Sequence, residues 1–208
     1  GTVNIGASNT PGSYILPKLL GEFKELYPQV TTNLHIAPTY EVEKMVLENK
    51  LDFAVNGGDK PNNNHIFVEV LTYDEVLLVA SPGSSLVQKG YIEPCDLNNA
   101  KYVAHEKDSK LYKLVENIIT ELGVPANIIM TLGNIDAIKQ AVSAGLGISA
   151  IPKSAVIAEL KFGLLKQLRI EDKLWLYPYN LIYHKNKHIA PSAEKLIDLI
   201  RTRMKKLA

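Results

Sequence analysis

The sequence predicts an α/β fold made of two lobes that are joined by two crossover strands, and three observations lead to this prediction. Short buried strand patterns alternate with amphipathic helix patterns along most of the 208 residues. The polar run NGGDKPNNN at residues 56–64 is the clearest composition break, and the alternation forms two blocks, one before and one after about Tyr73. The final helix, which Pro191 opens, has no strand of its own after YNLIYHK, so we expect it to return and pack on the first block.

The first block reads as strand, helix, strand, helix, strand. The five elements are expected at residues 3–6, 13–27, 30–36, 39–49 and 50–55. The first helix places apolar residues such as Leu19 and Phe23 at helical spacing, and Pro17 is tolerated if it lies in the first turn. This alternation implies a parallel sheet with right-handed crossovers.

The rest of the chain continues the alternation less regularly. Strands are expected at residues 66–71, 75–80, 101–106, 128–132, 147–151, 174–176 and 179–183, and helices at 110–122, from 134 to 145, and from Pro152 onward. These elements divide the chain into lobe I, residues 1–73 and 179–208, and lobe II, residues 74–178. Both lobes are expected to be Rossmann-like and to form a hinged clamshell. Because ligands of open α/β sheets bind at the carboxyl ends of strands, we expect a ligand in the cleft.

Composition argues against several classes of protein. The chain is 46% hydrophobic and 22% charged, and its formal net charge of +1 is too balanced for a nucleic-acid-binding surface. No apolar run approaches the roughly 18 residues that span a bilayer, and no signal peptide is visible. The single cysteine, Cys95, cannot form an internal disulfide and is interpreted as a small buried or edge residue. The start at GTVNIG, already inside a strand, suggests a domain of a longer protein or a processed mature chain.

The junction between the first strand and the first helix, IGASNTPGSYILPKLL, is more polar than a turn requires. Ser8, Asn9 and Thr10 stand there in succession. A helix N-terminus exposes unpaired N–H groups and about half a positive charge, so small hydroxyl and amide side chains there can complete a site for a carboxylate, sulfate or phosphate. The alternative is that one of the three residues only caps the helix. Three in succession exceed what a cap needs, and we therefore expect an anion site.

Two further strand-to-helix junctions lie in the second block. AHEKDSKLYK carries His105 and Ser109, and TLGNIDAIK carries Gly133 and Asn134. In a clamshell these residues would approach the first junction from the opposite wall. At the AHEKDSKLYK junction, an ordinary helix cap by Asp108 or Ser109 is the favoured alternative.

Motifs for catalysis and metal binding are missing from the sequence. It holds no GxSxG, no P-loop and no GxGxxG after a strand. The five histidines are scattered, and His184 and His188 straddle a turn instead of sharing one helix face. We therefore expect that the chain is not an enzyme, has no cofactor or metal, and holds an anion without transforming it.

Several phrases of the sequence, in this order, resemble the effector-binding domain of LysR-type transcriptional regulators. VNIGASNTPGSYILPKLLGEFKELYPQV resembles the first strand and helix of that family, with its Leu-Pro-x-Leu-Leu-x-x-Phe and Tyr-Pro-x-Val phrases. LENKLDFAV resembles its Leu-Asp-x-Ala strand, and AIKQAVSAGLGISAIPKSAV resembles its helix that runs into Gly-Leu-Gly-Ile and then Pro. LIYHKNKHIAPSAEKLIDLI resembles its closing strand and helix, so the resemblance covers essentially the whole chain.

The resemblance implies a type 2 periplasmic-binding-protein architecture that serves as a cytoplasmic sensor. The implied effector is a small anion such as a carboxylate, an amino-acid derivative or an oxyanion. The effector-binding positions of the family carry over to Ser8, Asn9, Thr10, His105, Ser109, Gly133 and Asn134. Many relatives have an Arg-Glu pair where this chain has His105 and Glu106, a departure that bears on the preferred anion.

The resemblance also implies partners for the chain. Domains of the family form homodimers in an antiparallel arrangement, here through the helix at residues 13–27, and full-length members form tetramers. DNA would be contacted only by a winged helix-turn-helix that this sequence does not include, and no membrane partner is expected. Effector binding would shift the population between two interlobe angles. The alternatives are an exported solute-binding receptor of the same fold and a hinge-fold enzyme.

Overall fold

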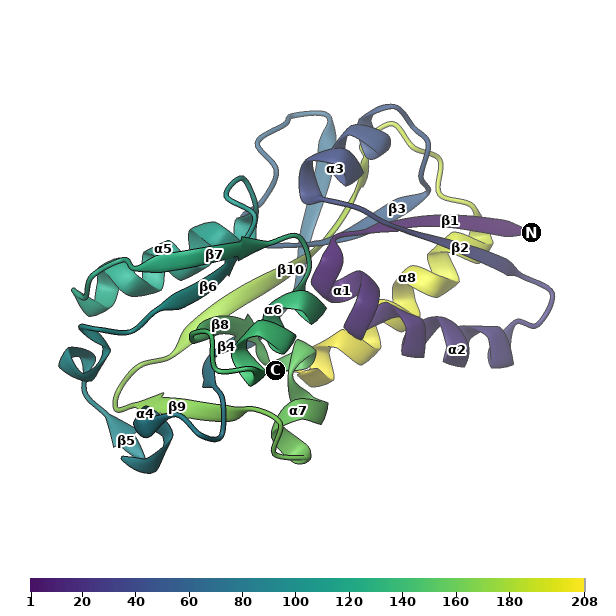
Figure 1. Ribbon diagram of the computed structural model, residues 1–208. Coiled ribbons are helices and arrows are strands. Elements are labelled where there is room, and N and C mark those ends of the chain that lie inside the picture. The colour runs from purple at the N-terminus through teal and green to yellow at the C-terminus, as the bar shows by residue number, and fades with distance from the viewer. Residues whose placement is uncertain (208) are drawn as a thin grey trace. The chain divides into compact units, whose positions relative to one another are not determined.

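The computed structural model describes residues 1–207, which form two compact units. Unit 1 contains residues 1–74 and the chain from Tyr177 onward, and unit 2 contains Glu75–Leu176. Two long strands, β4 (Ile66–Ala80) and β10 (Trp175–His184), contribute residues to both units (Figure 1). The two units are therefore connected by two crossover strands, as the sequence predicts.

The sheet of unit 1 has its parallel strands at the start of the chain. β1 (Thr2–Ala7) lies between β2 (Thr31–Ile36) and β3 (Phe53–Gly57) and is parallel to both. β10 is antiparallel to β3, and β4 is its other neighbour. The predicted parallel sheet of the first block is confirmed.

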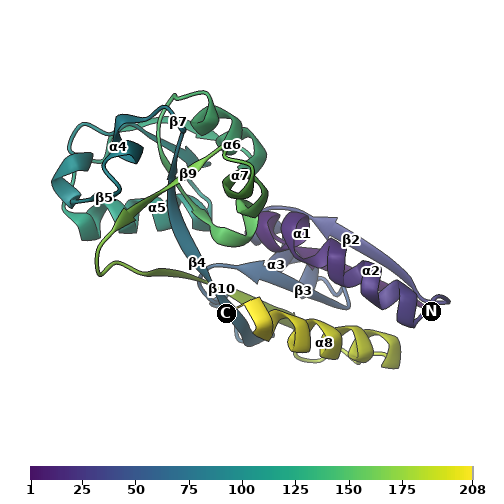
Figure 2. The same ribbon diagram turned by 90° about the horizontal axis from the view of Figure 1, so that it is seen from below.

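Helices cover both faces of this sheet. α3 (Thr39–Leu47) packs on one face, where Val42 and Val46 contact Ala54 and Ile182. α2 (Leu16–Leu26) and α8 (Pro191–Met204) lie side by side on the other face (Figure 2).

Gly6 on β1 allows α3 to approach the sheet closely. A Cβ atom there would lie 2.5 Å from Leu51 Cδ1 and 3.0 Å from Val42 Cγ1, so any larger residue would displace these buried side chains.

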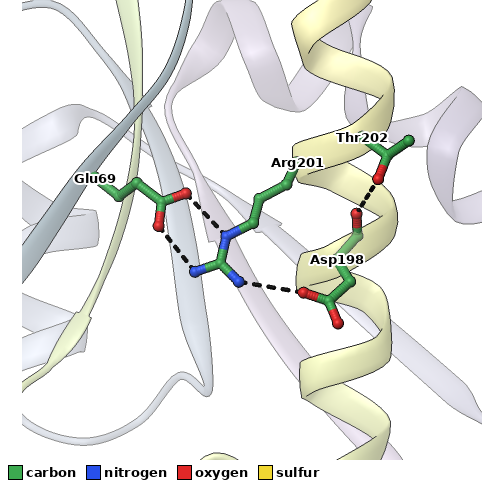
Figure 3. A network of polar contacts seen from close by, with 4 residues as sticks. All are labelled: Glu69, Asp198, Arg201 and Thr202. Carbon is green, nitrogen blue, oxygen red and sulfur yellow. Dashed lines mark hydrogen bonds and ion pairs between the residues drawn. The ribbon is translucent and has the colours of Figure 1, made fainter.

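Two arginines anchor α8 within unit 1. The Arg201 guanidinium donates to both carboxylate oxygens of Glu69 on β4 at 2.8 Å, and it also contacts Asp198 one turn earlier on α8 (Figure 3). Arg203 Nε donates to both carboxylate oxygens of Glu22 on α2 at 2.9 Å, and Arg203 Nη2 donates to one of them. Because a guanidinium matches the planar geometry of a carboxylate, these contacts specify how α8 lies against its neighbours.

Unit 2 is built around the second half of β4. This part of β4 is antiparallel to β8 (Ser149–Pro152) and to β9 (Lys166–Ile170), and β9 is parallel to β5 (Tyr91–Ile92). β6 (Tyr102–His105) and β7 (Ile128–Leu132) are parallel to each other. A bridge from Tyr102 to Ile148 connects β6 to the residue before β8.

Two long helices cover the strands of unit 2. α5 (Lys110–Leu122) packs on β6 and β8, and α6 (Ile135–Ser143) packs on β6, β7 and β8. The bounds of α5 and β7 agree with the prediction. The shorter helices are α4 (Ser85–Gln88) and α7 (Ile157–Lys161).

Several strands differ from the sequence prediction. The runs at 66–71 and 75–80 are one strand, β4, and those at 174–176 and 179–183 are one strand, β10. β5 and β9 were not predicted at all. The break at Tyr73 and Asp74 looked like a turn because it is polar, but Asp74 is buried and accepts a hydrogen bond from the Tyr179 hydroxyl at 2.7 Å. That bond lets a polar residue stay inside a continuous strand.

The first helix also differs from its prediction. It begins at Asn9 and is interrupted at Ile15, so that α1 (Asn9–Tyr14) precedes α2. Pro17 lies in the first turn of α2. If α1 continued without interruption, the Pro17 ring would clash with a backbone carbonyl of the preceding turn. Of the two alternatives for Cys95, burial is wrong, because the residue is exposed on the short 3₁₀ helix Pro94–Leu97.

Candidate ligand-binding site

Ser8 connects the ends of two neighbouring strands in unit 1. Its N–H donates to the Val55 carbonyl at 3.2 Å, and its hydroxyl oxygen accepts from the N–H of Gly57 at 2.9 Å. Ser8 also stands at the N-cap position of α1, but its side chain makes no capping bond. The residue therefore joins β1 to β3 at their carboxyl ends, which is where ligands of α/β sheets bind.

Asn9 and Thr10 form the first turn of α1, not a loop that precedes it. Their N–H groups belong to the helix start, where no carbonyl lies four residues back within the helix. The Thr10 side chain is 2% exposed, and its hydroxyl has no hydrogen-bond partner among residues 1–207. A buried hydroxyl without a partner at a helix start can accept or donate one hydrogen bond to a bound molecule.

Two asparagines that the sequence reading did not select lie close to this junction. Asn56 on β3 and Asn180 on β10 are opposite each other in the strand register, and both are buried. Neither amide oxygen has a partner among the described residues. The sequence places Asn56 at the end of a buried strand, but the polar run that begins with it predicts a loop.

The predicted residues of unit 2 lie at the ends of β6 and β7. His105 is in register with Leu132, so His105 and Gly133 stand at neighbouring strand ends. The Ser109 hydroxyl caps α5 by accepting from Tyr112 N–H at 3.0 Å, which agrees with the alternative considered for that residue. Asn134 caps α6 in the same way, by accepting from Ala137 N–H at 2.8 Å.

The His105 ring has an unusual environment. Both ring nitrogens are buried and have no partner among the described residues. The ring lines a cavity of about 10 Å³, the size of one water molecule, together with Leu111 of α5 and Ile135 of α6. Burial lowers the pKa of His105, and the negative charge of Glu106 opposes this effect only in part. His105 is therefore neutral at pH 7.

Gly133 lies next to a carboxylate. A Cβ atom at this position would be 3.1 Å from Glu106 Oε1. The edge of unit 2 thus carries one acidic group, one neutral imidazole and two helix caps. The structure gathers Ser8, Asn9 and Thr10 within unit 1 and the other four predicted residues within unit 2.

These groups suit binding better than chemical transformation. Each unit offers hydroxyl, amide and helix-start N–H groups at strand ends, the donor set that holds a small polar molecule. In the part of the chain that the structure describes, no three His, Cys, Asp or Glu side chains gather to hold a metal ion. None of the helices found in residues 1–207 is both long and apolar enough to cross a membrane.

An α/β domain with polar groups at its strand ends is typical of small-molecule-binding domains. The model of the family described as the LysR substrate binding domain matches residues 1–205. The chain belongs to this family, so the resemblance seen in the sequence is confirmed. The family consists of domains of transcriptional regulators, not of enzymes.

Relatives and solved structures agree with this assignment. A probable RuBisCO transcriptional regulator of Cyanophora paradoxa is 31% identical over 97% of this chain, which spans 64% of that relative. The regulatory domain of Synechocystis CcmR in complex with 2-PG is 22% identical, with a TM-score of 0.89 over 100% of this chain and 99% of that one. The effector binding domain of QuiR in complex with shikimate is 23% identical, with a TM-score of 0.84 over 99% and 98% of the two chains. The fold is thus the two-lobe, periplasmic-binding-protein-like fold of LysR regulatory domains.

Proposed function

We propose that the chain senses a small anionic effector for a LysR-type transcription regulator and binds it with residues from both units. In unit 1 the contacts come from Ser8, Asn9 and Thr10 at the start of α1. In unit 2 they come from His105, Ser109, Gly133 and Asn134. The observation that carries this proposal is the Thr10 hydroxyl, which is buried at a helix start and has no partner among the described residues.

The chemistry of the helix start favours an anion. The N–H groups of Asn9 and Thr10 in the first turn carry a partial positive charge and can donate to an anion, whereas Pro11 contributes no N–H. Small molecules occupy the solved regulatory domains of CcmR and QuiR, which have the same fold. A carboxylate, an amino-acid derivative or an oxyanion fits this set of donors.

A thermal-shift experiment with Thr10→Val tests the site. The probes are sulfate, phosphate, acetate, malate and glutamate, titrated against the wild-type chain. An anion at one hundred times its Kd stabilises the fold by about 2.7 kcal/mol, which is roughly 5–11 °C in Tm for a chain of this length. Thr10→Val should lose this shift and keep its unliganded Tm, because the hydroxyl that it removes has no partner.

The matched control is Thr202→Val on α8, where the hydroxyl donates to the Asp198 carbonyl on the helix surface. This variant should keep the full shift. Ser8 is not suitable for the same test, because its replacement by Val would leave the buried Gly57 N–H without an acceptor and cost about 1–3 kcal/mol. A full shift in Thr10→Val would reject the site.

We further propose that the domain forms a homodimer and that the intact regulator is a tetramer in the cytoplasm. In that tetramer, the dimer contacts transmit effector binding to the DNA-binding heads. Both units have edge strands with exposed apolar side chains. β2 ends in Ile36, which is 43% exposed, and β7 carries Ile129, also 43% exposed, while Leu26 on α2 is 59% exposed. Unpaired strand edges with exposed apolar side chains favour association with another chain. Sedimentation velocity should show a dimer for the wild type and a monomer for Leu26→Lys, and a monomeric wild type would contradict the proposal.

A further inference from the structure

Three buried polar atoms of unit 1 have no hydrogen-bond partner among residues 1–207. They are Thr10 Oγ1, Asn56 Oδ1 and Asn180 Oδ1, in side chains that are 2%, 2% and 0% exposed. Native proteins keep few such atoms, because a buried polar group without a partner destabilises the fold. When several occur together at the ligand-binding edge of a sheet, they indicate a group that is to be bound there.

The two asparagines form a pair. Asn56 and Asn180 are directly opposite each other in the antiparallel register of β3 and β10, so that their side chains are neighbours on the same face of the sheet. The amide nitrogen of Asn180 donates to the Gly58 carbonyl at 2.8 Å, and that of Asn56 donates to the Thr39 carbonyl at 3.5 Å. Both amide groups therefore use their donors within the protein and leave their acceptors unused.

This pair lies beside the groups already assigned to the anion. Gly57, the residue after Asn56, donates its N–H to the Ser8 hydroxyl. Thr39 is the first residue of α3, a helix of nine residues whose start has no side-chain cap. The carboxyl ends of β1 and β3 thus combine a positively polarised helix start with two unused amide oxygens.

An amide oxygen can only accept a hydrogen bond, so its missing partner must be a donor. A bare oxyanion or a simple carboxylate offers acceptors alone and leaves both oxygens unsatisfied. A hydroxyl or an ammonium group satisfies them. Because both oxygens are buried, the donor must be a small group.

We propose that the effector is a small acid with a hydroxyl or ammonium group next to its anionic group, and that the amide oxygens of Asn56 and Asn180 accept hydrogen bonds from that donor. The inference rests on the proposed anion site and narrows its ligand to hydroxy acids and amino acids. Asn56 and Asn180 then determine specificity, while the helix starts hold the charge.

Calorimetric titration of matched acids tests this inference. The probes are succinate against malate and aspartate, and propionate against lactate and alanine, so that the members of each set differ in the donor. The donor-bearing acid should bind the wild-type chain about tenfold more tightly than its parent, the effect of one hydrogen bond of ordinary strength. In Asn56→Leu and Asn180→Leu this preference should fall to about unity, while the parent acid keeps its affinity.

Asn64→Leu is the matched control, because Asn64 lies in the exposed loop before β4 and should keep the wild-type preference. Equal binding of parent and donor-bearing acids to the wild type would overturn the inference and leave the anion site in place. A preference that persists in both leucine variants would overturn it as well, since other groups would then recognise the donor. Binding of no acid at all would contradict the anion site itself. If the leucine variants do not fold, the comparison of parent and donor-bearing acids on the wild type still tests the inference, and Asn180→Ser replaces the leucine variants in the same titration.

Discussion

Gly57 at the end of β3 offers a sharp test of how the strand ends pack. A Cβ atom on Gly57 would lie 2.4 Å from Tyr177 Cε1 and 2.7 Å from the Tyr177 hydroxyl oxygen. The Tyr177 ring is 5% exposed and meets the Tyr179 ring edge-on at 5.7 Å, so it cannot swing aside freely. The backbone of Gly57 is not left-handed, and the only obstacle to alanine is therefore space.

Gly57→Ala should destabilise the fold by about 1–3 kcal/mol, the usual cost of overpacking a core by one methyl group. This corresponds to a fall in Tm of roughly 2–12 °C for a chain of this length. The same substitution at Gly21, which is exposed within α2 and has nothing within 4 Å of its Cβ position, should instead stabilise the fold by about 0.5–1 kcal/mol. The two changes are chemically identical and have opposite expected signs.

Urea denaturation followed by far-ultraviolet circular dichroism measures both effects. Tyr177→Leu removes the ring atoms that a Gly57→Ala side chain would meet, so the double variant should be more stable than the sum of the single changes by at least about 1 kcal/mol. Tyr177→Phe keeps the ring and should give little relief. Wild-type stability in Gly57→Ala, or strict additivity with Tyr177→Leu, would refute the packing argument.

Two other predictions concern buried polar groups. Tyr179→Phe removes the hydroxyl that donates to the buried Asp74 carboxylate and should cost about 1.5–3 kcal/mol in the same assay, whereas Tyr40→Phe at an exposed position should cost almost nothing. Burial lowers the pKa of His105 in the folded chain, so the unfolded chain takes up the proton first as the pH falls below about 6.5, and stability should decline from there toward the folded pKa. His105→Leu should lose this part of the decline between pH 7 and 5. An unchanged Tm profile in that variant would contradict the buried, neutral state of His105.

Elements with strong local signals were predicted well. α5 has apolar residues at helical spacing, a Ser109 cap and a left-handed Gly123 at its end, and its bounds were correct. β4 was split in two at the polar residues Thr72 and Asp74, and β10 was split at Pro178. The partners of a crossover strand come from distant segments of the chain. A buried polar pair such as Tyr179 and Asp74 therefore interrupts the alternation of apolar and polar residues that indicates an ordinary strand.

The candidate site was predicted in part. The polar junction after β1 was found from residue types, and the proposed anion site rests on the buried Thr10 hydroxyl, which has no partner among the described residues. Asn56 and Asn180 were not found from the sequence. Their residue numbers differ by 124, and the two residues become neighbours only through the register of β3 and β10.

The sequence by itself determined the family and the elements with strong local signals, such as α5 and β7. These depend on contacts within a few residues, and caps, prolines and apolar spacing report them directly. Only the tertiary structure decided which polar groups remain available to a ligand. The Ser8 hydroxyl is occupied by an N–H group 49 residues away, while the Thr10 hydroxyl and two amide oxygens have no such partner among the described residues. Hydrogen-bond satisfaction depends on distant neighbours, and the chain must fold before those neighbours meet.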